Sequence, residues 1–145
     1  MNKPILLVED DENDVFLLTK AMKRLGIGNP LRVASDGQQA IDYVEGQGKF
    51  SDRQEFPVPY LVLLDLKLPH VKGLDVLKRI REGNGPKPIV VILSSSKNAT
   101  DVSGAYVLGA NAYLAKPTDF ESLVKLVGSI ADFWLTHNVV NTLGL

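Results

Sequence analysis

The 145-residue chain contains no cysteine, which excludes disulfide bonds, thiolate catalysis and cysteine-based zinc sites. It also lacks an excess of basic charge, since 16 Lys and Arg against 17 Asp and Glu give a formal net charge of -1. Proteins that hold nucleic acid by its phosphates usually carry a basic excess or a basic patch. The composition therefore gives no sign of nucleic-acid binding, and the lack of cysteine fits a reducing compartment.

Long apolar runs are missing as well. The first apolar stretch, Ile5 to Val8, is short and is followed at once by acidic residues, so it cannot form the core of a signal peptide. No run approaches the roughly 18 residues that a membrane-spanning helix needs. We therefore expect a cytoplasmic protein with no membrane segment.

Strand-like and helix-like patterns alternate along the chain. Three aliphatic runs are typical of strands buried on both faces of a parallel sheet, and two weaker strand patterns accompany them. The strong runs are 5–8, 60–64 and 89–93, and the weaker ones are 31–33 and 112–115. Five segments with apolar residues at helical spacing follow these runs. Five strands alternating with five helices predict an α/β fold whose parallel sheet has helices on both faces.

The length and the even alternation predict a single domain over residues 1–145. One connection is unusually long: the segment from Gly46 to Pro59 is polar and contains two prolines. We expect it to be a loop within this domain, at the upper end of normal loop length.

The residues that close the strands carry the chemistry, because functional groups of an open parallel sheet gather at the carboxyl ends of its strands. Glu9 and Asp10 close the first strand, and Asp65 closes the third. Like charges that converge there repel, and burial makes their ionisation costlier still. A divalent cation would relieve this conflict. Mg²⁺ suits it best, since it takes oxygen ligands and is often shared with a phosphate.

Two further strand ends complete the pattern: Ser94 closes the fourth strand and Lys116 follows the fifth. A hydroxyl, an ammonium and a metal suit the charge of a phosphoryl group in transfer. An aspartate at this place can itself be the nucleophile and form an acyl phosphate. Each residue alone has an ordinary explanation as a helix cap, a solvated turn or a Lys–Pro turn. Their coincidence at four strand ends favours a phosphoryl-transfer site.

These residues resemble the receiver domain of bacterial two-component response regulators, over a match from about Lys3 to about Ala131. The segment 5–11 (ILLVEDD) resembles the family's first strand with its acidic pair, and 63–69 (LLDLKLP) resembles the segment around its phosphoacceptor. The resemblance implies a flavodoxin-like, doubly wound sheet of five parallel strands in the order 2-1-3-4-5.

The resemblance also implies a role for each site residue. Asp65 would be the phosphoacceptor, and Ser94 and Tyr113 would move on activation. Lys116 would contact the phosphoryl group and precede a cis peptide bond to Pro117. The implied Mg²⁺ ligands are Glu9, Asp10, Asp65 and the backbone carbonyl of Lys67.

A narrower resemblance comes from the segment 46–59 and the tail 132–136 (DFWLT). Both are similar to small stand-alone receivers, most of all to cyanobacterial phytochrome-associated response regulators. This implies a phosphoprotein that accepts its phosphoryl group from a light-sensing histidine kinase and catalyses only its own phosphorylation and dephosphorylation. With a core over 3–131 and a helical extension over 132–145, we expect no output domain, and an unknown downstream protein would receive the signal.

The last predicted helix ends in Phe133, Trp134 and Leu135. Consecutive residues of a helix cannot all face one core, so at least one of the three should point outward. A large apolar side chain exposed in this way is typical of an interface. We therefore expect a homodimer through the face formed by the fourth helix, the fifth strand and the fifth helix.

Three alternatives remain at this point. A flavodoxin-like nucleotide-binding protein would cradle phosphate on the loop after the first strand, but here the acidic residues 9–14 would repel it. An aspartate-nucleophile phosphatase of the haloacid-dehalogenase type resembles Asp-x-Asp, whereas Lys67 stands two residues after Asp65. A degenerate receiver would fold without being phosphorylated, which the complete set of site residues argues against.

Overall fold

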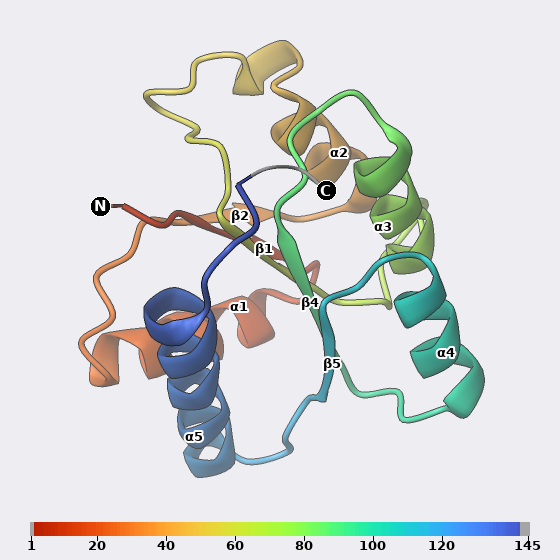
Figure 1. The fold of residues 1–145 in the computed structure, drawn as a ribbon. Coiled ribbons are helices and arrows are strands. Elements are labelled where there is room, and N and C mark those ends of the chain that lie inside the picture. The colour runs from red at the N-terminus through yellow and green to blue at the C-terminus, as the bar shows by residue number, and fades with distance from the viewer. Residues whose placement is uncertain (1, 143–145) are drawn as a thin grey trace.

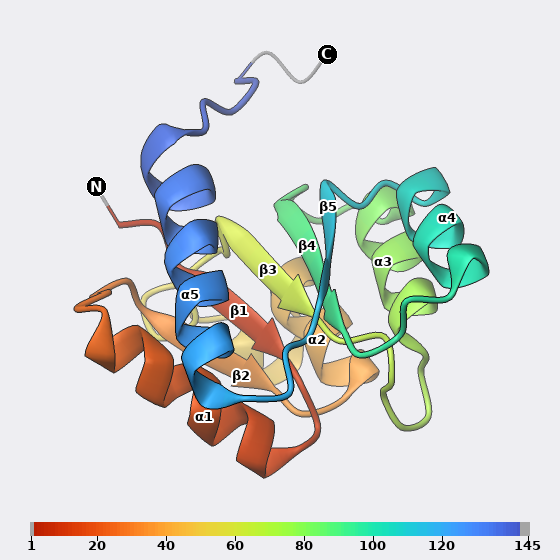
Figure 2. The same ribbon diagram turned by 90° about the horizontal axis from the view of Figure 1, so that it is seen from below.

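Five strands form one parallel sheet in the order β2-β1-β3-β4-β5 (Figures 1 and 2). The computed structural model describes residues 2–142. The strands are β1 (Ile5–Val8), β2 (Leu31–Ala34), β3 (Leu61–Leu64), β4 (Ile89–Ser94) and β5 (Ala112–Ala115). The helices are α1 (Glu12–Arg24), α2 (Gly37–Glu45), α3 (Gly73–Glu82), α4 (Ala99–Val107) and α5 (Phe120–Ile130). The predicted fold class and strand order are confirmed.

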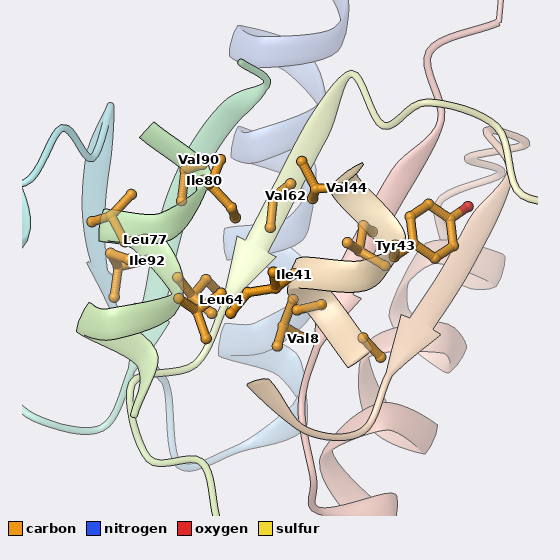
Figure 3. Packing of buried hydrophobic residues seen from close by; sticks show 14 of the residues in the cluster. Val8, Ile41, Tyr43, Val44, Val62, Leu64, Leu77, Ile80, Val90 and Ile92 are labelled. Carbon is orange, nitrogen blue, oxygen red and sulfur yellow. The ribbon is translucent and has the colours of Figure 1, made fainter. Parts of the chain in front are cut away.

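The helices cover the sheet on both faces: α1 and α5 lie on one side, and α2, α3 and α4 lie on the other (Figures 1 and 2). Successive side chains of a strand point to opposite faces. Leu6 and Val8 of β1 therefore belong to the core under α2 and α3, while Ile5 and Leu7 belong to the core under α1 and α5. Figure 3 shows the first of these cores. Strands that are buried on both sides explain the unbroken aliphatic runs.

Helix α1 begins where Asp11 caps it. The Asp11 carboxylate accepts hydrogen bonds from the backbone N–H groups of Asn13 and Asp14, which satisfies donors that a helix start leaves unpaired. This cap starts the helix directly after β1. It thereby places the first turn of α1, including Asp14, beside the carboxyl end of the sheet.

The long connection after α2 is more ordered than a plain loop. It contains a 3₁₀ turn, η1 (Gly48–Phe50), and the rings of Tyr43, Phe50 and Phe56 pack on one another with centroids 5.1–5.9 Å apart. The Arg53 guanidinium donates to the carbonyls of Tyr43 and Val44 at 2.8 Å. The segment is thus tied to the C-terminal end of α2.

Helix α5 continues into a π-helical turn, η2 (Ala131–His137). The helical extension predicted over 132–145 therefore ends at His137, residues 138–142 are not helical, and 143–145 lie outside the described residues. Lys3 donates from Nζ to the carbonyl of Leu135 at 2.6 Å, which ties this turn to the start of the chain. Phe133 is 54% exposed, whereas Trp134 and Leu135 pack against the core under α1 and α5. The prediction that one of the three points outward is confirmed. No helix within residues 2–142 is long and apolar enough to cross a membrane.

Candidate functional site

The predicted site residues meet at the carboxyl edge of the sheet, toward which the arrowheads of β1 and β3 point in Figure 2. Backbone hydrogen bonding continues one residue past the ends of β1, β3 and β5. Glu9 N–H donates to the carbonyl of Ala34, Asp65 N–H to that of Val8, and Lys116 N–H to that of Ser94. Glu9, Asp65 and Lys116 are therefore fixed by the sheet itself rather than by mobile loops.

Lys116 is the centre of the site. Its Nζ donates to Glu9 Oε1 at 2.6 Å, to Asp14 Oδ2 at 2.9 Å and to Asp65 Oδ2 at 3.2 Å. One ammonium thus joins carboxylates from the ends of β1 and β3 and from α1. Asp14 was not among the predicted site residues, because its place in a helical pattern gave no sign that it turns back toward the sheet.

Burial and charge oppose each other at this cluster. Glu9 and Asp65 are buried. Burial, helped by the charge of Asp65, raises the pKa of Glu9 to about 7, although the hydrogen bond from Lys116 works against this rise. Burial alone would lower the pKa of Lys116, but its hydrogen bonds to Glu9 and Asp14 outweigh that and raise it above its usual value. Lys116 is therefore a permanent cation at neutral pH.

The carboxylates of Glu9, Asp10 and Asp65 offer oxygen atoms that all lie within 4.8 Å of one another. Such a group of hard, anionic oxygens fits Mg²⁺, which needs oxygen ligands and keeps several of its waters. Asp10 is exposed, so the group opens to solvent on one side. The predicted convergence of these three residues is confirmed as geometry. The structure gives no contact for the carbonyl of Lys67, whose part as a ligand stays a prediction.

The segment that follows Asp65 is held in place by its own backbone and by a glycine. Lys67 N–H donates to Asp65 Oδ1 at 3.1 Å, which orients the carboxylate. A Cβ atom on Gly73 would lie 2.5 Å from Leu66 Cα and 2.7 Å from the Asp65 carbonyl oxygen. Only glycine lets α3 approach this backbone so closely. The glycine at the first position of α3 was the one signal in the sequence for this contact.

Ser94 and Tyr113 are connected through Ser96. The buried Ser94 hydroxyl accepts a hydrogen bond from Ser96 N–H at 3.2 Å, and the Tyr113 hydroxyl donates to the Ser96 carbonyl at 2.8 Å. Both predicted switch residues therefore hold the same peptide segment between β4 and α4. The sequence pattern identified the two residues but not the backbone that links them.

One expectation is wrong. The Lys116–Pro117 bond was expected to be cis, but the structure has no cis peptide bond among residues 2–142. The trans form is the ordinary state of a bond before proline, favoured by about 0.5–1 kcal/mol. It leads the chain from β5 to Asp119, which caps α5.

Comparison with known proteins agrees with this geometry. The family model of the response regulator receiver domain matches residues 5–128. The chain belongs to this family. Response regulator Rcp1 of Synechocystis sp. (strain ATCC 27184 / PCC 6803 / Kazusa) is 39% identical to this receiver over 134 residues, which cover 92% of the chain and 89% of Rcp1. The receiver fold and its phosphoacceptor role in two-component signalling are thereby confirmed. The solved structure of a phytochrome response regulator, RcpA, confirms the homology to phytochrome-associated regulators. The flavodoxin-like and phosphatase alternatives are not favoured.

Solved structures extend the likeness. Response regulator RPA3017, described in red light signaling of R. palustris, superimposes with a TM-score of 0.89 at 35% identity, over 97% of this chain and 99% of that one. The phosphorylated cyanobacterial phytochrome response regulator RcpA reaches a TM-score of 0.89 at 31% identity, over 98% and 100%. The Mn²⁺-bound form of Rcp1 reaches 0.84 at 35% identity, over 97% and 99%.

Proposed function

We propose that this receiver takes a phosphoryl group on Asp65 from a phosphohistidine of a sensor histidine kinase. A carboxylate oxygen of Asp65 attacks phosphorus, the phosphorus–nitrogen bond breaks, and the imidazole leaves with the bonding electron pair. The observation that carries the proposal is the Lys116 ammonium, which bonds both Asp65 and Glu9. It places a fixed cation where the negative charge of the transferring group arrives, and positioned charge is the main aid to phosphoryl transfer.

The residues that would hold Mg²⁺ are Glu9, Asp10, Asp65 and the backbone carbonyl of Lys67. The clustered carboxylate oxygens support the first three of these assignments, and the existence of a Mn²⁺-bound form of the relative Rcp1 supports a divalent cation. When bound, the metal would supply positive charge to the phosphoryl oxygens. The protein's own part is to orient Asp65, which the Lys67 N–H does from one side and Lys116 does from the other.

The response to phosphorylation is proposed to start at Ser94. When its hydroxyl turns to the phosphoryl oxygens, Ser96 N–H loses its acceptor, so the segment that also binds the Tyr113 hydroxyl has to rearrange. A local change in charge would thus bias a two-state element next to α4 and β5. This gives the surface of α4, β5 and α5 two forms for a partner to distinguish.

We propose a phytochrome-type histidine kinase as the donor. RcpA is described as a phytochrome response regulator and RPA3017 as a response regulator in red light signaling, and both, like Rcp1, resemble this chain over nearly its full length. We place the exchange in the cytoplasm, as the family resemblance implies. Phosphotransfer assays with the purified kinase domain of a phytochrome and with one of an unrelated sensor test this specificity. Equal rates from the two donors would remove the phytochrome assignment and leave the phosphoacceptor role intact.

We also propose a homodimer through the face of α4, β5 and α5. Tyr106 and Val107 of α4 and Phe133 beyond α5 are large apolar side chains that are exposed to solvent. Sedimentation of wild type and Phe133→Ala at micromolar concentration, with and without the phosphoryl group, tests this. Wild type that stays monomeric in both states would contradict the dimer and leave an unidentified downstream protein as the partner of this face.

The phosphoacceptor is tested by intact-mass analysis after incubation with acetyl phosphate and Mg²⁺. Wild type should gain one phosphoryl group, and Asp65→Asn should gain none. Asp75→Asn is the matched control, since it removes an exposed aspartate of α3 and leaves the site untouched. An Asp65→Asn variant that gains the group as readily as Asp75→Asn would show that another residue is the phosphoacceptor.

A further inference from the structure

Asp14 lies at the site but has no part in the function proposed above. It stands in the first turn of α1, and its Oδ2 accepts a hydrogen bond from Lys116 Nζ at 2.9 Å. Its side chain is 35% exposed, whereas those of Glu9 and Asp65 are 4% and 9% exposed. Of the three carboxylates that bind Lys116, Asp14 is therefore the one that water reaches most easily.

The hydrogen bonds of Lys116 are fully used. An ammonium has three N–H donors, and the carboxylates of Glu9, Asp14 and Asp65 take all three. A phosphoryl group on Asp65 adds oxygen acceptors, yet no donor of Lys116 is left for them. One of the existing bonds has to break before Lys116 can bind the phosphoryl group.

The bond to Asp14 is the one that breaks at least cost. The Glu9 side chain is buried, so breaking its bond to Lys116 would leave a carboxylate without its hydrogen-bonded cation at a place that water hardly reaches. Asp14 is partly exposed, and water replaces the lost bond there.

We propose that Asp14 is a positioning residue, which anchors Lys116 in the unphosphorylated receiver and releases it when Asp65 carries the phosphoryl group. The inference rests on the proposed function. Asp14 opposes phosphorylation in two ways, because it competes for a donor of Lys116 and adds a negative charge beside the incoming anion. The same charge favours the binding of Mg²⁺ by the unphosphorylated site. Removal of the Asp14 carboxylate should therefore weaken the binding of Mg²⁺ and strengthen the binding of a phosphoryl group or its mimic.

The test uses two probes, MgCl₂ alone and beryllofluoride at saturating Mg²⁺, the latter as a mimic of the acyl phosphate. Binding of each is measured by calorimetry. Asp14→Asn should bind Mg²⁺ more weakly than wild type. It should bind beryllofluoride about fivefold more tightly, the equivalent of a partly exposed ion pair of about 1 kcal/mol. Asp14→Ser, which also lacks the carboxylate, should shift both affinities in the same directions.

Two variants serve as controls. Glu12→Gln removes the same charge from the same helical turn, but Glu12 is exposed and does not bond Lys116. Its affinity for beryllofluoride should match wild type. Asp14→Glu restores a carboxylate and should return the affinity toward the wild-type value. A role of Asp14 in helix stability alone would not produce opposite shifts for the two probes.

The possible outcomes separate the two proposals. If wild type binds no beryllofluoride, the proposed function fails and the anchoring inference fails with it. If wild type binds it and Asp14→Asn binds no more tightly than Glu12→Gln, the inference alone is wrong. If Asp14→Asn binds beryllofluoride more weakly than wild type, the inference is also wrong, because Asp14 would then guide Lys116 toward the phosphoryl group.

Discussion

Replacing Asp10 with Asn should stabilise the protein in the absence of metal. The Asp10 carboxylate lies within 4.8 Å of ligand oxygens of Glu9 and Asp65. At that separation two unit charges in water repel by about 0.9 kcal/mol. Lys116 bonds both neighbours and cancels roughly half of the combined repulsion, which leaves about 0.9 kcal/mol to be gained. For a domain of 145 residues that corresponds to a rise of about 3 °C in Tm.

In the presence of Mg²⁺, wild type should be more stable than Asp10→Asn. At a concentration of metal a hundred times its Kd, binding stabilises wild type by about 2.7 kcal/mol. Loss of a supporting group of a metal site weakens affinity by about 10–100-fold, and the loss of Asp10 as a ligand should reach the upper end of that range. Asp10→Asn would then gain only about 0.4 kcal/mol from the same metal. In the presence of Mg²⁺, wild type would become the more stable protein by about 1.4 kcal/mol.

Urea unfolding at pH 8, with EDTA or with MgCl₂, measures both effects. This pH lies above the pKa of about 7 that burial gives Glu9, so most of the Glu9 carboxyl is ionised. Glu12→Gln is the control, because it removes an acid of the first turn of α1, where negative charge is favourable. It should be no more stable than wild type in EDTA and should gain as much from Mg²⁺. An Asp10→Asn variant that is less stable than wild type in EDTA would refute the repulsion, and equal gains from Mg²⁺ would refute Asp10 as a ligand.

Three more substitutions test other parts of the structure. Lys116→Met should lower the free energy of unfolding of the metal-free protein by about 2 kcal/mol at pH 8. The loss should be smaller at pH 6, because Glu9 then binds a proton and needs no cation. An equal loss at both pH values, measured by urea unfolding, would contradict this. Arg53→Ala should lower the free energy of unfolding by about 2 kcal/mol and speed proteolysis within residues 47–59, because it removes hydrogen bonds to backbone carbonyls of α2. Phosphoryl uptake should stay unchanged. Gly73→Ala should slow phosphoryl uptake by about tenfold or more in the mass assay, because its Cβ would displace the backbone after the phosphoacceptor. A loss of rate of this size is typical when reacting groups are slightly misplaced. Gly104→Ala, whose Cβ would meet only ordinary contact, should leave uptake unchanged.

The sequence predicted the fold well because each buried strand is marked by its own residues. The strands β1 and β3 are aliphatic throughout and β4 is aliphatic up to its last residue, Ser94, and α/β sheets allow few arrangements of such strands. The ends of these strands then place Glu9, Asp65 and Ser94 at one edge without any knowledge of tertiary contacts. Strand order itself came from the family resemblance, since local patterns do not encode which strands are neighbours.

What the sequence did not predict depends on contacts between distant segments. Asp14 and Lys116 are 102 positions apart, and only the packing of α1 on the sheet brings them together. Arg53 binds backbone carbonyls, which every residue possesses, so no sequence pattern identifies its partners. The bond before Pro117 has two forms that differ by about 1 kcal/mol or less, and local sequence cannot decide between them.

The ion pair of Glu9 with Lys116 joins residues that are 107 positions apart. A ribosome releases Glu9 and Asp65 well before it releases Lys116, and a domain generally folds as one unit. A partly synthesised receiver therefore carries the aspartate that accepts the signal but lacks the cation that steadies it. Only after β5 joins the sheet do these carboxylates gain the ammonium of Lys116. The site therefore gains its cation only when most of the receiver, up to residue 116 of 145, has left the ribosome.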